Sequence, residues 1–238
     1  MTTLLRAELL KLRTTRTFAA VIGTAAALSL LLVVLGATLG KEKNPQALFT
    51  NNAITYVIVL LGAIGMTGEW RHRTITGSVL AAPNRVRLMV AKAAAYSLAG
   101  VVLSAVVGIA TMIVGTIVLH ANGDPTLGLG GLADVLWRNL AVAAVLGPLG
   151  VAVGALVRNQ VVTVIGLITI ASVLEPGINQ VAPAVAKFGP LAGAPGGVLG
   201  GPNGIGLLAP GIALIVLIAW AGALFAGAAW RLNSRDLV

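Results

Sequence analysis

Long apolar stretches alternate along this chain with short stretches that carry the charged residues. Six stretches hold almost no charge, at about residues 18–39, 51–67, 93–119, 139–157, 161–175 and 207–230. Each is near the roughly 20 residues that a helix needs to cross the hydrocarbon of a bilayer. Backbone groups in lipid must pair within their own segment, so each stretch should be a helix. The pattern predicts an all-α membrane protein with six transmembrane helices in a single domain, residues 1–238.

Composition and charge set the class and the orientation. Only 10% of the 238 residues are charged and 58% are hydrophobic, whereas about 25% of a soluble domain is charged. The net charge of +9 could suggest nucleic acid, but we favour cytoplasmic loops, where membrane proteins collect Lys and Arg. The six-span model puts 12 of the 16 cations on the side of the termini. We therefore expect a multi-pass plasma-membrane protein with both termini cytoplasmic and no nucleic-acid partner.

The first 16 residues have a helical pattern of their own. Leu5, Leu9 and Leu12 recur at i, i+4 and i+7, with the cations mostly off that stripe. This spacing predicts an amphipathic helix in the membrane interface over residues 1–16. A cleaved signal peptide is the alternative, and it is disfavoured because the following apolar run exceeds the usual 7–15 residues.

A basic segment separates the second and third apolar stretches. Its five cations are Arg71, Arg73, Arg85, Arg87 and Lys92. Such a cluster cannot lie in hydrocarbon, so residues 69–87 should form a loop outside the membrane. The loop has a helical pattern of its own, which indicates a structured loop that contacts a partner. Glu69, where the second span ends, is expected to pair with Arg71 or Arg73.

The segment from 178 to 206 is apolar but rich in Gly and Pro. Short re-entrant or interfacial helices fit it better than a solvated loop, since exposed non-helical backbone is not tolerated in lipid. Glu175 and Pro176 precede it at the end of the fifth span. An acidic residue in that place is a candidate for function, and here we expect an outer gate. A carboxylate at headgroup level, or one paired with Lys187, is the alternative.

Glycine and tryptophan positions carry two structural expectations. Glycines of the fourth span should permit close helix packing rather than bind a ligand; these are Gly147, Gly150 and Gly154. Tryptophans beside span ends should be interface anchors; these are Trp70, Trp137 and Trp230.

The chemistry-bearing residues predict no catalytic or metal site. There is no cysteine, the two histidines lie in different loops, and residues 36–42 only approach the nucleotide-binding G-x-x-x-x-G-K-[ST] pattern. We therefore expect no enzyme activity, no metal and no cofactor in this chain. A secondary transporter or channel that does not use ATP stays an alternative, although it would need ionisable groups inside the spans, which hold almost none.

Two segments resemble the ABC type-2 permease family, the membrane subunits of ATP-driven exporters. The first is the run Leu5–Arg13 before the first span. The second carries the family pattern of a glutamate, a threonine, a leucine, a proline followed by arginine, and a lysine. Its matching residues are Glu69, Thr74, Leu80, Pro83, Arg85 and Lys92. The six-span layout extends the resemblance over the whole chain.

The resemblance implies a dimer of membrane subunits, identical or homologous, on two ATPase subunits that bind the ATP and Mg²⁺. Residues 71–82 would be a coupling helix held by the ATPase, and 178–206 an outer lid over the path of an amphipathic or hydrophobic substrate. The residues implied to contact the ATPase are Glu69, Arg71, Arg73, Thr74, Ile75, Val79, Leu80, Pro83 and Arg85.

Overall fold

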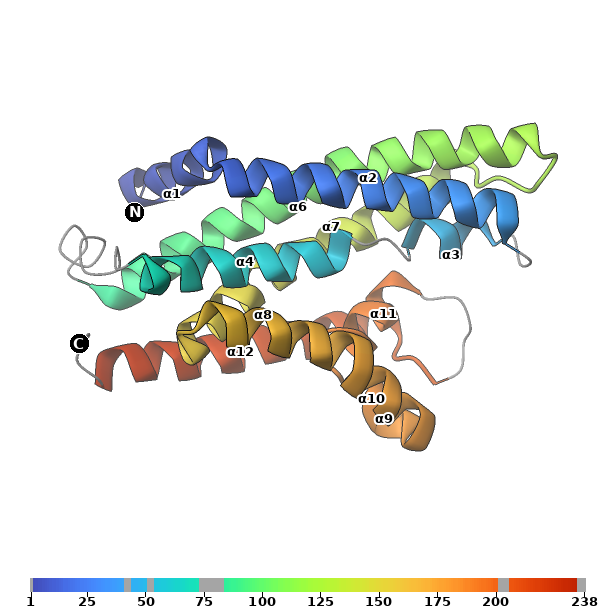
Figure 1. Ribbon diagram of the computed structural model, residues 1–238. Coiled ribbons are helices and arrows are strands. Elements are labelled where there is room, and N and C mark those ends of the chain that lie inside the picture. The colour runs from blue at the N-terminus through green and yellow to red at the C-terminus, as the bar shows by residue number, and fades with distance from the viewer. Residues whose placement is uncertain (1, 41–43, 51–53, 73–83, 201–205, 235–238) are drawn as a thin grey trace.

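The computed structural model describes residues 2–40, 44–50, 54–72, 84–200 and 206–234, and in these ranges the chain is helical, without strands. Figure 1 shows the helices in chain order. Their bounds are α1 Thr2–Thr14, α2 Arg16–Leu39, α3 Pro45–Thr50, α4 Ile54–Arg71, α6 Arg85–Ala121, α7 Leu129–Val157, α8 Gln160–Thr169, the π-helical turn η1 Ile170–Leu174, α9 Glu175–Val181, α10 Pro183–Ala186, α11 Gly193–Leu199 and α12 Pro210–Ser234. Six spans long and apolar enough to cross a membrane are found in the described ranges, as predicted.

Two of the spans begin well before the expected residue. Helix α6 includes Lys92, and α7 includes Arg138. With 37 residues, α6 is about 55 Å long at 1.5 Å per residue, far more than the ~30 Å of hydrocarbon. Charged residues mark the edge of the apolar layer, and the helices continue beyond that edge.

The fifth span is longer than predicted. It runs from Gln160 to Val181, so the expected end near Glu175 was wrong. Pro176 does not end the span, because the π-helical turn η1 has already shifted the backbone hydrogen bonds: the Glu175 N–H donates to the carbonyl of Ile170. The turn η1 just before it widens the helix locally.

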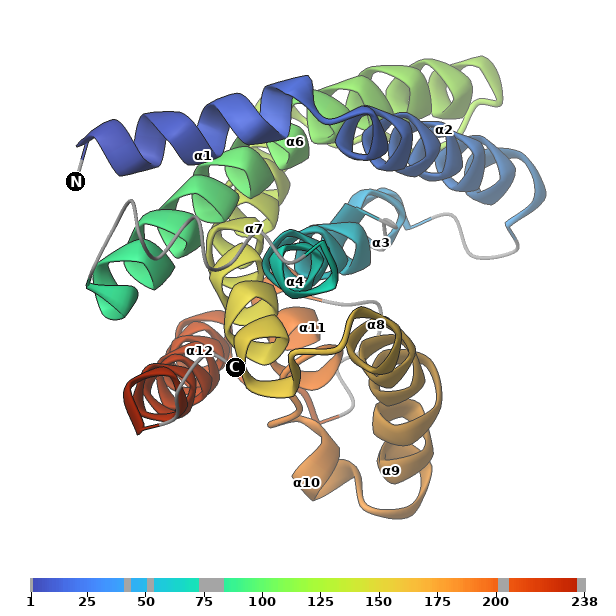
Figure 2. The same cartoon turned by 60° about the vertical axis from the view of Figure 1, so that its left-hand side comes forward.

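Helix α4 lies at the centre of the bundle with α7 beside it, as Figure 2 shows, while α1 and α2 lie on one side and α8 and α12 on the other. In the apolar stretch of the span that contains α4, 60% is buried inside the bundle, and in that of α7 56% is buried. The corresponding share is 17% for the spans that contain α2, α8 and α12. The outer helices therefore present most of their apolar side chains outward.

Glycines allow the two central helices to touch. A Cβ built on Gly62 of α4 would collide with the carbonyl of Gly147 in α7, and one on Gly150 would collide with the carbonyl of Val59. Gly154 faces the carbonyl of Ala63 in the same way. Small residues that bring backbones together are a usual means of packing helices in membranes, so the packing role expected for these glycines is confirmed.

A proline inside α7 is accommodated by a neighbouring helix. Pro148 has no N–H, which leaves the carbonyl of Ala144 without its helical donor. The hydroxyl of Ser97 in α6 donates to that carbonyl at 2.8 Å. This hydrogen bond satisfies the Ala144 carbonyl, which lies in the bilayer region, and joins α6 to α7.

Both termini lie at one end of the bundle in Figure 1, which we call the basal end; the opposite end is the distal end. Short helices gather at the distal end, where α10 and α11 interrupt the segment 178–206. The expected short helices are therefore present in its described part, and α11 packs on α12 and α7. A membrane position for them stays a prediction.

Candidate functional site

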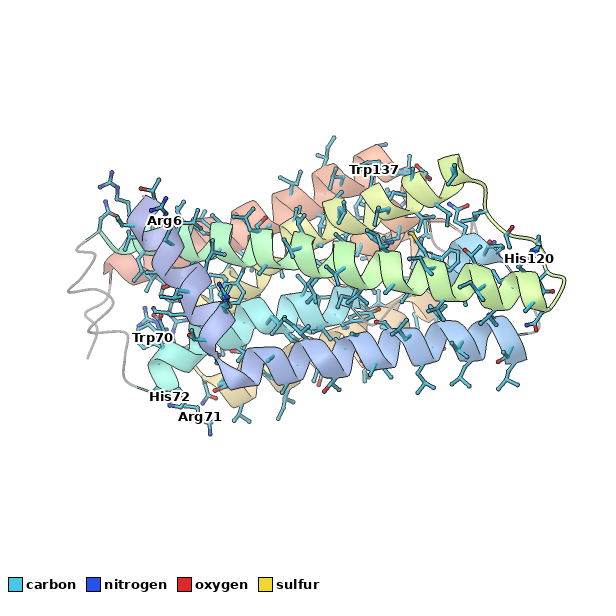
Figure 3. All side chains as sticks on the ribbon, turned by 90° about the horizontal axis from the view of Figure 1, so that it is seen from above. Arg6, Trp70, Arg71, His72, His120 and Trp137 are labelled. Atoms are coloured by element: carbon cyan, nitrogen blue, oxygen red, sulfur yellow. The ribbon has the colours of Figure 1, made fainter. Side chains whose placement is uncertain are left out.

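The basal end holds the charged residues of the central helix α4, together with Trp70. Figure 3 shows Arg6 of α1, Trp70, Arg71 and His72 at this end, whereas His120 lies at the distal end and Trp137 toward it. The two histidines are therefore too far apart to share a ligand. The chain leaves α4 here and returns at α6, so the basic segment predicted to contact a partner is attached at this end.

Four charged side chains from three helices form a closed ring at the basal end. Lys92 Nζ lies 2.6 Å from Glu8 Oε2 and 2.9 Å from Glu69 Oε1. Lys11 Nζ lies 2.8 Å from Glu8 Oε1 and 3.0 Å from Glu69 Oε1. Charges alternate around the ring, so its two ammonium groups and two carboxylates balance. We call these four residues the ion ring.

Local structure places each member of the ion ring. Glu8 and Lys11 are three residues apart on α1, which puts both on one face. Glu69 lies in the last turn of α4. Lys92 lies two turns into α6, whose start is fixed by Asn84: its side-chain oxygen accepts the backbone N–H of Arg87 at 3.0 Å, a usual N-cap bond.

Burial makes the ion ring unusual. The Lys92 side chain is 2% exposed, those of Glu8 and Glu69 are 5% and 9%, and Lys11 at 52% covers the ring on the outside. Lysine and glutamate are almost never buried unless they are paired. Removing two such charges from water is expensive, and the pairing offsets that cost only when the geometry is satisfied. The ring therefore fixes where α1 sits more than it adds net stability.

Lys11 keeps its charge in this setting. Burial acts to lower the pKa of its ammonium group, but the hydrogen bond to Glu8 and the charge of Glu69 outweigh it, so the pKa is raised above 10.5. The ion ring thus keeps its outer cation at any physiological pH.

The leucine stripe of α1 packs on protein. Leu12 is 7% exposed and belongs to the main core, and Leu5 and Leu9 are partly buried against that core. The amphipathic helix is confirmed, but its apolar face contacts the bundle, with α6 as its main neighbour, rather than acyl chains. The stripe and the ion ring together hold α1 against the start of α6.

The predicted contact residues have mixed outcomes. Glu69 enters the ion ring, whereas Arg71, one of the partners expected for it, donates from Nη1 to Gln160 Oε1 at 3.3 Å instead. Arg85 is the first residue of α6. The remaining predicted residues lie outside the part of the chain that the structure describes; they are Arg73, Thr74, Ile75, Val79, Leu80 and Pro83.

Three members of the ion ring were missed as site residues. Glu8 and Lys11 belong to the run Leu5–Arg13 that carries part of the family resemblance, and Lys92 was noted only as a cation of the basic segment and as part of the same resemblance. Their signal was an acidic residue on a basic amphipathic helix and a lysine at the edge of an apolar run. Pairing them requires knowing that α1 folds back over α6, which spacing along the chain does not show.

Glu175 at the distal end also differs from its expected setting. Glu175 is 6% exposed. Its carboxylate accepts the backbone N–H groups of Leu191 at 2.8 Å, Ala192 at 2.6 Å and Gly193 at 3.0 Å. Lys187, the alternative partner, instead lies over the Phe188 ring at 5.3 Å. Glu175 therefore holds the start of α11 to the fifth span.

The comparisons with known proteins agree with this architecture. No curated protein matches the chain. The family model described as ABC-2 family transporter protein matches residues 4–174, which include α1, the ion ring and the basic segment. Members of this family lack a catalytic ATPase domain, so membership implies an ATPase on a separate subunit. The chain belongs to the ABC-2 family and is the multi-pass membrane component of an ABC-2 type transporter.

Proposed function

We propose that the chain pairs with a second permease subunit, identical or homologous, to form an export path for an amphipathic or hydrophobic substrate. Two copies of the ATPase drive it from the cytoplasm, where both termini lie. The observation that carries the proposal is the ion ring. It joins α1 to the end of α4 and the start of α6, which are the two ends of the basic segment.

The ion ring supports a division of labour at the basal end. The family resemblance implies that residues 69–87 dock on the ATPase, and Glu69 and Lys92 flank that segment. Lys92 is paired with Glu8, and Glu69 is paired with Lys11, so both are tied to α1. A force on the basic segment would therefore reach α1, α4 and α6 together. ATP-driven closure of the ATPase pair would then shift the population of the membrane helices between two arrangements.

The apolar character of the spans supports the substrate class. Large apolar side chains face outward on α2, α8 and α12, and the buried charged residues of the described ranges are Glu8, Glu69, Lys92 and Glu175. These lie toward the ends of the spans. The path between two such subunits would be nearly uncharged, which suits an amphipathic or hydrophobic cargo and gives no support to an ion-coupled secondary transporter.

The outer gate belongs to the same proposal. Glu175 accepts the backbone N–H groups at the start of α11, and we take this anchored arrangement of residues 178–200 as the closed state of the gate. Opening of the path would require this anchor to yield or to move with the fifth span.

Purification of the tagged chain from its native membrane tests the proposal. A co-purifying protein with a P-loop is expected, and ATP hydrolysis should accompany it. Leu80→Asp should release the ATPase while the permease still inserts in the membrane, because an apolar contact worth about 1.5–3 kcal/mol is lost. Arg73→Ala should keep the ATPase bound, since exposed ion pairs are worth only about 0–1 kcal/mol. A permease that purifies without any ATPase would sink the proposal.

A further inference from the structure

Arg158 ends α7 in a backbone conformation that is unfavourable for an arginine. Its φ is 60° and its ψ is 10°, the left-handed region that glycine usually occupies at a helix end. The backbone N–H of Arg158 donates to the Gly154 carbonyl at 3.0 Å, a bond that a glycine would make equally well. The side chain must therefore provide what offsets the strain.

The Arg158 side chain contacts two other helices. Its guanidinium carbon lies 4.7 Å from the centre of the Trp70 ring in α4, within the range of a cation–π attraction. Its Nη2 donates to the carbonyl of Arg231 in α12 at 3.2 Å. Arg231 in turn donates from Nη1 to the carbonyl of Leu156 in α7 at 2.6 Å. The two arginines thus serve carbonyls at each other's helix ends, where intrahelical donors are missing.

Three consecutive residues at the end of α4 contact different helices. Glu69 belongs to the ion ring with α1 and α6. Trp70 lies under Arg158, which binds α12, and Arg71 is bonded to Gln160 at the start of α8. The last turn of α4 therefore connects both sides of the bundle, immediately before the basic segment.

Helix α4 is not among the main neighbours of α12. The main neighbours of α12 are α7 and α11, and only 17% of its apolar stretch is buried. The arginine contacts at its basal end are the described polar links between it and the end of α7. They place Arg158 between α4, which leads to the basic segment, and α12, the last span.

We propose that Arg158 is a positioning residue for coupling: it ties the basal end of α4 to α7 and α12, so that movement of α4 carries α12 with it. The proposal rests on the proposed function, because it needs an ATPase to move the basal end. It goes further in naming the residue that passes the movement to the second side of the bundle.

Spin labels provide the test, because the chain has no cysteine. Cysteines at 72 and 234, both exposed positions, would report the α4 to α12 distance, and a pair at 72 and 125 would report movement relative to the distal end. Both are measured on the full complex with its ATPase, without nucleotide and trapped with ATP, Mg²⁺ and vanadate. In the parent, the 72–125 distance should change on trapping while the 72–234 distance stays constant.

Arg158→Gly separates coupling from folding, since it removes the side chain and relieves the backbone strain. Its thermal stability should match the parent, but its 72–234 distance should become nucleotide-dependent. Arg158→Lys, which keeps a cation, should restore the parent behaviour. A 72–234 distance in Arg158→Gly that stays constant on trapping, or that broadens equally in both states, would overturn the proposal.

Trp70 and a distal control complete the test. The Trp70 Nε1–H is buried without an acceptor in the described ranges, so Trp70→Phe should behave as the parent, and Trp70→Leu should behave as Arg158→Gly. Asn122→Ala removes a comparable tie at the distal end, where Nδ2 donates to the Ala37 carbonyl at 3.1 Å, and it should leave both distances unchanged. Failure of the parent complex to bind an ATPase would contradict the proposed function itself, which distinguishes the two results.

Discussion

Lys92 and Glu8 form a buried ion pair of 2.6 Å although 84 residues separate them. The pair joins the amphipathic helix that precedes the first span to the helix that follows the basic segment. A buried ion pair is weak evidence of net stability, but it penalises every arrangement in which one partner is left alone. We infer that its main effect is to fix the position of α1.

Breaking the ion ring should be costly. Lys92→Met leaves the Glu8 and Glu69 carboxylates buried with only the half-exposed Lys11 between them, and loss of one partner of a buried pair costs about 3–5 kcal/mol. Thermal unfolding of the purified protein in detergent, followed by circular dichroism, should show a clear drop in midpoint. The double variant Glu8→Met with Lys92→Met should regain part of the loss.

Lys187→Met is the matched control, because that lysine contacts the Phe188 ring and no described carboxylate. It should unfold as the parent does. Equal midpoints for Lys92→Met and Lys187→Met would show that the ion ring does not hold α1.

The contribution of Lys11 to the stability of the folded protein should depend on pH. Its pKa is raised in the folded protein above the ordinary 10.5, so its contribution is complete below pH 10.5 and is lost as the pH rises through the folded value. Lys11→Gln should therefore be less stable than the parent at neutral pH, and the difference should shrink above pH 10.5. Unfolding midpoints of both proteins across alkaline pH measure this. A difference that stays constant above that pH would contradict it.

The spans were predictable, but the ion ring was not. Hydropathy reports which residues can lie in lipid, so six spans and the packing glycines followed from the sequence. It does not report helix ends, which is why α6 and α7 begin early and the fifth span continues past Glu175. The partners of Glu69 depend on how α1 folds over α6, and local spacing favoured Arg71 because it is near in the chain.

Glycines at the α4–α7 contact should be intolerant of larger residues. A Cβ on Gly150 would collide with the Val59 carbonyl and lie 3.0 Å from the Ala63 nitrogen, and a rigid backbone cannot yield as a side chain could. Gly150→Val should lower the yield of folded protein in size-exclusion chromatography. Gly166→Val on α8 is the control, since nothing lies within 4 Å of its Cβ position, and it should elute as the parent. Comparable yields for the two variants would refute close packing at this contact.

Membrane orientation can be read from cysteine labelling in whole cells. With both termini in the cytoplasm, single cysteines at 43 and 125 should react with an impermeant reagent, and cysteines at 160 and 234 should not. The positive-inside asymmetry gives this expectation, and the shared basal location of the termini agrees with an even number of spans. Labelling at 234 from outside would overturn it.

Glu175→Gln should loosen the distal segment without disturbing the basal end. The carboxylate accepts three backbone N–H groups, two of them on Oε2. An amide has one acceptor oxygen, and its NH₂ group would face donors, so at least one N–H loses its partner at a cost of about 1–3 kcal/mol.

A cysteine introduced at Ala192 should then react faster with a thiol reagent in Glu175→Gln than in the parent. Export of a lipophilic fluorescent dye should also change, while ATPase binding and ATP hydrolysis stay at parent levels. Lys187→Gln, which leaves the three bonds intact, should change neither labelling nor export. If the cysteine at 192 labels at the parent rate in Glu175→Gln and dye export is unchanged, the carboxylate has no gating role and serves only to cap α11.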